Sequence, residues 1–67
     1  MCESKVFLIE GRKKEKIMDE AVLVKDEGSK ITLTGLLGDR RKIKNARIVG
    51  VNAEKHEIFI KKISNED

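Results

Sequence analysis

The residues best equipped for chemistry are the first two of the chain. Cys2, the only cysteine among 67 residues, directly follows Met1. The α-amine of Met1, the backbone nitrogen of Cys2 and the Cys2 thiolate can close two adjoining five-membered chelate rings on one metal ion. An amine, a deprotonatable amide and a thiolate suit a metal that prefers square-planar nitrogen and sulfur ligands, chiefly Ni(II) or Cu(II). The pattern predicts a metal site at Cys2 in which Met1 contributes its amine.

These donors do not complete a four-coordinate site. A symmetric dimer could supply the missing ligand from a second Cys2, which would couple metal binding to dimerisation. If Met1 is removed, Cys2 keeps its own amine beside its sulfur, so the identity of the nitrogen ligand stays open. The alternative interpretation is an unimportant cysteine at a disordered chain end, because so short a motif is weak evidence.

The side chains that could assist the thiol are few. Glu3 could add an oxygen ligand, although a solvated carboxylate is the simpler interpretation. A catalytic thiol needs a nearby base, and the single histidine, His56, is distant in the sequence and fits an exposed turn. The chain contains no glycine-rich phosphate loop, no carboxylate pair in a motif and no zinc-type Cys/His spacing. We therefore predict that the protein is not an enzyme.

Basic clusters suggest a second hypothesis, weak RNA binding. The net charge is +3 with a pI near 9.2, and the clusters include Arg40, Arg41 and Lys42. Such cations are sufficient for phosphate contacts. Recognition of single-stranded bases usually needs aromatic platforms, and the chain has two phenylalanines without tyrosine or tryptophan. Solvated strand faces explain the clusters more simply.

Composition limits the architecture and the compartment. Hydrophobic residues make up 39% and charged residues 40%, and no apolar run approaches the roughly 18 residues of a membrane span. The N-terminal stretch does not resemble a secretory signal, and a lone thiol is typical of the cytoplasm. We expect a single domain over residues 1–67. A domain of this size without a disulfide is marginally stable, which favours a homodimer.

Short apolar runs at regular spacing predict an all-β fold. The expected strands are residues 5–10, 16–18, 22–25, 30–34, 40–44, 47–52 and 56–61. The first is a continuous apolar run, expected to be buried on both faces, whereas Ile31 and Leu33 share one face of a half-buried strand. Phe7 and Phe59 face away from the aliphatic stripes, where a second subunit could cover them. Many short strands are typical of a small antiparallel barrel or sandwich.

Turn residues separate these strands. The expected turns are residues 12–15, 26–29, 38–39 and 52–55, with a break at 45–46. Gly28 can supply a positive φ, and Gly38-Asp39 suits a two-residue type II′ hairpin. Residues 19–21 could form a helical turn or an irregular link. Residues 62–67 are expected to form a frayed polar tail.

The N-terminal triplet Met1-Cys2-Glu3, followed by the apolar run from Val6 to Ile9, resembles the CooT family of small nickel-binding proteins. Weaker similarity covers the Glu27-Gly28 turn, Ile31 to Leu33, Leu36-Leu37-Gly38 and Ile58 to Ile60. This family is linked to nickel delivery to carbon monoxide dehydrogenase, and relatives have also been labelled predicted RNA-binding proteins.

The resemblance implies a homodimer of Sm- or SH3-like β barrels that binds Ni(II) at the interface through Cys2, with Met1 beside it. The implied function is that of a nickel metallochaperone or store, with carbon monoxide dehydrogenase as the suspected client. Neither the client nor the choice of nickel over copper or zinc follows from the residues themselves.

Overall fold

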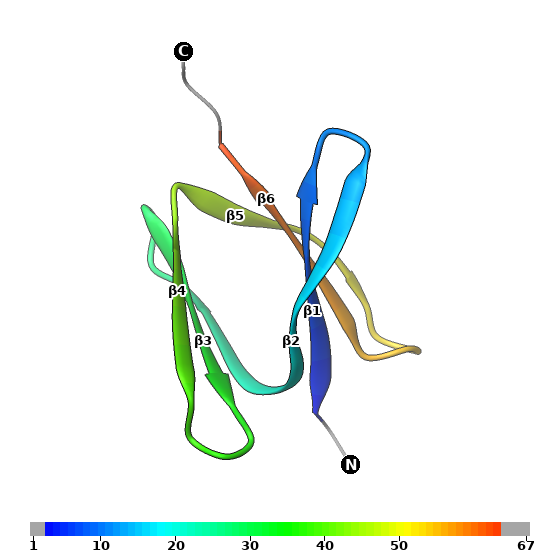
Figure 1. Ribbon diagram of the computed structural model, residues 1–67, viewed down its shortest axis with the longest axis vertical. Helices are drawn as coiled ribbons and strands as arrows, with labels where there is room; N and C mark the ends of the chain where they lie inside the picture. Colours follow the sequence, from blue (N-terminus) through cyan, green and yellow to red (C-terminus); the bar gives the residue numbers. More distant parts are fainter. Residues whose placement is uncertain (1–2, 64–67) are drawn as a thin grey trace.

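In a computed structural model of the chain, which describes residues 3–63, six strands form one sheet (Figure 1). The strands are β1 (Ser4–Glu10), β2 (Lys13–Asp26), β3 (Lys30–Gly35), β4 (Arg40–Lys44), β5 (Ala46–Asn52) and β6 (Glu57–Lys62). They lie side by side in the order β4-β3-β2-β1-β6-β5. Over the described residues there is no helix, and hence none that could cross a membrane. The predicted all-β class is confirmed.

The prediction of a purely antiparallel sheet is wrong at one pairing. β6 runs parallel to β1, with Phe7 opposite Phe59 and Leu8 opposite Ile60, whereas the other neighbours are antiparallel. The alternation of apolar residues along a strand determines which face is buried but not which strand lies alongside. The antiparallel prediction therefore failed at the one pair that joins the two ends of the chain.

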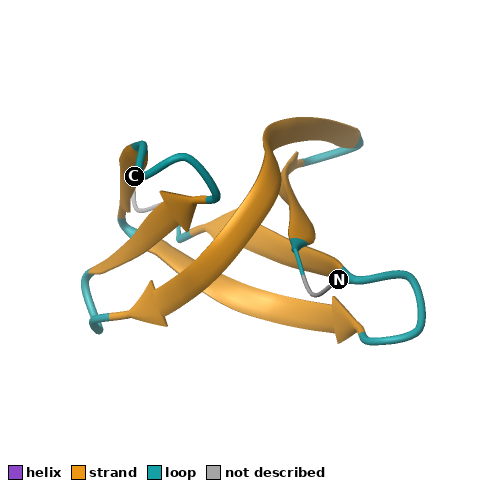
Figure 2. Cartoon of the chain, turned by 90° about the horizontal axis from the view of Figure 1, so that it is seen from below, coloured by secondary structure: helices purple, strands orange, loops and turns teal. Residues whose placement is uncertain are grey.

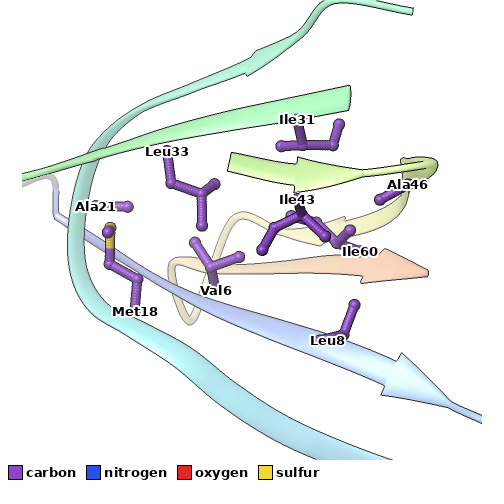
Figure 3. Packing of buried hydrophobic residues seen from close by; sticks show 9 residues of the cluster. All are labelled: Val6, Leu8, Met18, Ala21, Ile31, Leu33, Ile43, Ala46 and Ile60. Atoms are coloured by element: carbon purple, nitrogen blue, oxygen red, sulfur yellow. The ribbon is translucent and has the colours of Figure 1, made fainter. Parts of the chain in front are cut away.

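The sheet curls around one core but does not close into the predicted barrel. β4 and β5 are its two edges, and over residues 3–63 no ladder joins them. Figure 2 shows the curl, and Figure 3 shows buried side chains from all six strands pointing toward one another. The core consists of Val6, Leu8, Met18, Ala21, Ile31, Leu33, Ile43, Ala46 and Ile60. Ile31 and Leu33 are both fully buried, which confirms the face predicted for them.

β2 produces much of this curl. Its first half pairs with β1 and its second half with β3, so the expected segments 16–18, 19–21 and 22–25 form one strand of 14 residues. Three register shifts interrupt these ladders, and each inserts an additional residue into β2. Bulges of this kind bend a strand and increase its twist. They also disturb the period of two, which explains why the sequence did not predict one continuous strand.

The two faces of β1 are unequal, contrary to the prediction that both are buried. Val6 is fully buried and Leu8 nearly so, whereas Phe7 is half-buried on the outer face. There the Phe7 ring stacks on Phe59, with centroids 5.7 Å apart and planes inclined by 22°. The Lys14 ammonium lies 5.0 Å from the Phe7 centroid, within cation–π range. A stacked pair and one lysine thus shield part of the outer face.

The hairpin between β3 and β4 occurs where expected but has a different turn. The Gly38 amide donates to the Gly35 carbonyl at 3.0 Å, so Leu36 and Leu37 are the central residues instead of Gly38-Asp39. Gly38 follows them with φ +91°, a conformation that L side chains rarely adopt. A turn closed by a left-handed glycine is the usual geometry of three-residue hairpin loops.

The remaining turns also differ in detail from the sequence prediction. The charged turn expected at residues 12–15 is limited to Gly11 and Arg12, because β2 already begins at Lys13. Asn45, with φ 54°, forms the predicted break. β6 continues through Lys62, and the Ile63 amide donates to the Asn45 carbonyl at 2.6 Å. The rest of the expected tail, residues 64–67, lies outside the described residues.

Candidate functional site

Met1 and Cys2 lie outside the described residues, which begin at Glu3, directly before β1. Glu3 is half-buried, and Ser4 pairs with Ala21 of β2. On the other side of the strand, the Lys5 amide donates to the His56 carbonyl at 2.9 Å. β1 is therefore hydrogen-bonded on both sides at its start, two to three residues after Cys2 in the sequence.

Exposed apolar side chains gather around this end of the sheet. Ser4 pairs with Ala21, and Ala21 pairs with Gly35, so three strands align in one row at the start of β1. Four large apolar side chains follow within two residues of that row: Val22 (52% exposed), Leu23 (53%), Leu36 (49%) and Leu37 (90%). Figure 1 shows the β3–β4 hairpin at the same end of the molecule as the start of β1. We call Leu36 and Leu37 the leucine turn.

The fold brings His56, the single histidine of the chain, beside the start of β1. It is exposed, has φ 55° and precedes β6, which fits the predicted turn histidine. Its backbone contact with Lys5 places it next to the start of β1, although the two residues are distant in the sequence. The described part of the chain contains no group of three or more His, Cys, Asp or Glu side chains that could hold a metal.

The basic residues of the RNA hypothesis point in different directions. Arg41 lies on the same side of β4 as the buried Ile43, and its Nη1 donates to the Ile17 carbonyl of β2 at 2.8 Å. Arg40 and Lys42, at the alternate positions of this strand, project to its other side and are exposed. β3 and β2 separate this strand from the Phe7–Phe59 pair on β1 and β6. The aromatic rings and these cations therefore do not form one platform.

The Arg41 hydrogen bond satisfies a backbone carbonyl at a bulge. Val6 pairs with Met18 and Phe7 with Lys16, which leaves Ile17 as the inserted residue. We expect Arg41→Met to lower the free energy of unfolding by about 1 kcal/mol, because the carbonyl loses a charged donor but remains within reach of water. Urea unfolding measures this loss.

The matched control is Arg40→Met, the same change on the exposed side of β4. We expect it to alter the free energy of unfolding by less than about 0.5 kcal/mol. Equal losses in the two variants would show that the Arg41 contact with β2 does not stabilise the fold.

Both the sequence and the fold of this chain are similar to known proteins. The model of a family described as CO dehydrogenase accessory protein CooT matches residues 1–61. No curated protein matches the sequence. Among solved structures, this chain is similar to a crystal structure assigned as CooT from Carboxydothermus hydrogenoformans, with a TM-score of 0.81 and 21% identity. The alignment covers 94% of this chain and 100% of that chain, and at this identity it establishes the shared fold.

Proposed function

Because the chain belongs to the CooT family of CO dehydrogenase accessory proteins, we propose that it binds Ni(II) through Cys2 and holds or delivers the metal during maturation of a nickel enzyme. One observation carries the proposal: the family match begins at residue 1 and so includes both Met1 and Cys2. Carbon monoxide dehydrogenase is the proposed client, since the family is described as its accessory protein.

The chemistry of the donors supports nickel. The Cys2 thiolate, its backbone nitrogen and the Met1 amine form a nitrogen and sulfur set of the kind that Ni(II) accepts in a square plane. The donors must lose protons to bind, so the affinity for nickel falls as the pH falls. A serine or an internal cysteine would lack part of this set.

The fourth ligand is proposed to be Cys2 of a second copy. Covalent geometry keeps the Cα of Cys2 within about 8 Å of the Cα of Ser4. This reach supports a shared site at the end of the sheet where the leucine turn and its apolar neighbours are exposed. Packing this end against a second copy would bury these side chains and bring two thiols together.

Isothermal titration with Ni(II) tests the proposal. A site shared by two copies takes up one nickel ion for each pair of chains. A site completed by His56 of the same chain takes up one ion for each chain and would overturn the shared arrangement. The absence of saturable nickel binding would contradict the proposed function as a whole.

The dimer can be tested separately at the leucine turn. Leu37 is 90% exposed, so Leu37→Asp leaves the core of the monomer intact. In the proposed dimer the new carboxylate would be buried without a partner, and we expect the dissociation constant of the dimer to rise at least about tenfold. Sedimentation velocity over a range of protein concentrations measures this change.

Val49→Asp is the control for the Leu37 variant. It adds the same charge at a 56% exposed apolar position on β5, beside the pair formed by Ile48 and Ile60 instead of the row at Ser4. Its dimerisation should match that of the unmodified protein. A Leu37→Asp protein that associates normally would place the dimer contact elsewhere.

A further inference from the structure

The open seam of the curled sheet forms a groove. Its volume is about 630 Å³, within the range of roughly 300–1,000 Å³ that is typical of ligand sites. One wall is β4, and the opposite wall is the first half of β2, represented by Glu15 and Ile17. Leu8, Ile43 and Ile63 provide apolar surface between the walls.

Both walls of this groove are strand edges with backbone groups free to pair. β4 pairs with β3 on its other side, and the first half of β2 pairs with β1 on its other side. Over the described residues 3–63 no further strand pairs with either edge. The Ile17 carbonyl already accepts a hydrogen bond from Arg41. The part of the β2 edge that can pair with an added strand therefore runs from Lys13 to Lys16. Free edges of this kind accept an added strand.

The lining of the groove carries an excess of positive charge. Five cationic residues border it, namely Arg41, Lys42, Lys44, Lys61 and Lys62, against the two acidic residues Glu10 and Glu15. Lys42 and Lys44 belong to the outer side of β4, so they flank the mouth of the groove. The cations come from β4 and from the end of β6, so they flank the groove on two sides. An occupant that alternates acidic and apolar residues would match both the charge and the apolar surface.

We infer that this groove binds an extended acidic peptide segment of a partner protein, which adds a strand to the open edge of β2. Main-chain hydrogen bonds to the edge provide affinity, alternate apolar side chains face Leu8 and Ile43, and the intervening carboxylates meet Lys44 and Lys61. The site lies at the opposite end of β1 from Ser4, since it includes Ile9 and Glu10. Its occupancy therefore does not depend on the metal proposed at Cys2.

A peptide fits the groove better than a nucleic acid does. RNA would use the cations but neither the backbone edge nor the apolar surface. Glu10 and Glu15 would also repel a phosphate chain, whereas Phe7 and Phe59 lie on the outer face of the sheet and not in the groove. Stacking of bases on aromatic rings, the usual source of affinity for single strands, is not available here.

The test uses a synthetic peptide of eight residues that alternates glutamate and valine, with fluorescence anisotropy for affinity and amide chemical shifts for location. We expect saturable binding that shifts amides of β2 and β4 and weakens with added salt. A peptide N-methylated at alternate residues keeps its charge but cannot donate along the edge, and it should bind at least about tenfold more weakly. Equal binding of the two peptides would refute strand addition.

Charge reversal tests the groove itself. Lys44→Glu combined with Lys61→Glu should weaken peptide binding at least about tenfold. The control, Lys25→Glu combined with Lys55→Glu, makes the same change in net charge outside the groove and should alter affinity less than about twofold. Equal effects of the two pairs, or tighter binding of octauridylate than of the peptide, would overturn the proposal. Cys2→Ser should leave peptide affinity unchanged, so failure here and failure of nickel binding are distinguishable.

Discussion

Replacing Cys2 with serine is expected to abolish Ni(II) binding while the sheet remains folded. A serine hydroxyl stays protonated near neutral pH and is a harder ligand than a thiolate. Loss of an outer-shell partner alone reduces metal affinity about 10–100-fold, so loss of the ligand itself should exceed about 100-fold. Titration calorimetry and the thiolate-to-nickel absorption band measure this loss. The core begins at Val6 and does not include Cys2, so the thermal midpoint without metal should not change.

Two further changes separate the roles of the other donors. A short peptide extension before Met1 converts its amine into an amide, so weaker binding would identify the amine as a ligand and unchanged binding would exclude it. His56→Ala removes the only imidazole, which lies beside the start of β1. If the ligand set is two copies of Cys2 with backbone nitrogens, the histidine variant binds normally. Nickel affinity that survives Cys2→Ser would contradict the thiolate site.

The core was predictable from the sequence where the signal was local. Ile31 and Leu33 alternate with threonines, and this pattern alone identified a strand with one buried face. Asn45 interrupted the apolar pattern at a position where a left-handed backbone residue separates two strands. These features depend on a few consecutive residues, whose side chains and backbone preferences are sufficient to specify them.

The features that the sequence did not predict depend on which strands pair and in which register. The three inserted residues in β2 are defined as bulges only by its pairing registers with β1 and β3, which the sequence does not specify. The parallel contact between β1 and β6 joins segments about fifty positions apart, and no local pattern encodes it. Gly38 was expected to begin a two-residue type II′ turn, but the hydrogen bonds of Gly35 place it after Leu36 and Leu37 in a longer loop.

The same distinction applies to the site. The chelating potential of Met1 and Cys2 follows from adjacent residues and needs no fold. His56 lies beside the start of β1 because β6 pairs with β1. That pairing cannot be seen in the sequence, where His56 is far from Cys2 along the chain. Arg41 was grouped with Arg40 as a phosphate-binding residue, whereas the bulge at Ile17 engages its side chain. Consecutive side chains in a strand point to opposite faces, so Arg40 and Arg41 cannot contact the same surface.

Leu33→Ala is expected to cause the largest loss of stability among changes far from the proposed metal site. Leu33 is fully buried at the centre of β3, between the neighbours Val24 and Arg41 on adjacent strands. Removing a buried leucine side chain costs about 2–5 kcal/mol through lost burial and the remaining cavity. A domain of 67 residues has a total stability of roughly 3–10 kcal/mol. The variant should therefore melt at least about 10 °C lower and be partly unfolded at 37 °C.

Leu37→Ala makes the identical chemical change at a 90% exposed position and is the matched control. In dilute protein it should change the thermal midpoint by less than about 2 °C, because little apolar surface is removed from water on folding at this position. At high concentration a dimer contact at the leucine turn would raise the midpoint of the unmodified protein more than that of the Leu37 variant. The loss in Leu33→Ala, in contrast, should persist at every concentration, because a core cavity weakens each copy separately. Equal losses at both leucines in dilute protein would contradict a core centred on Leu33.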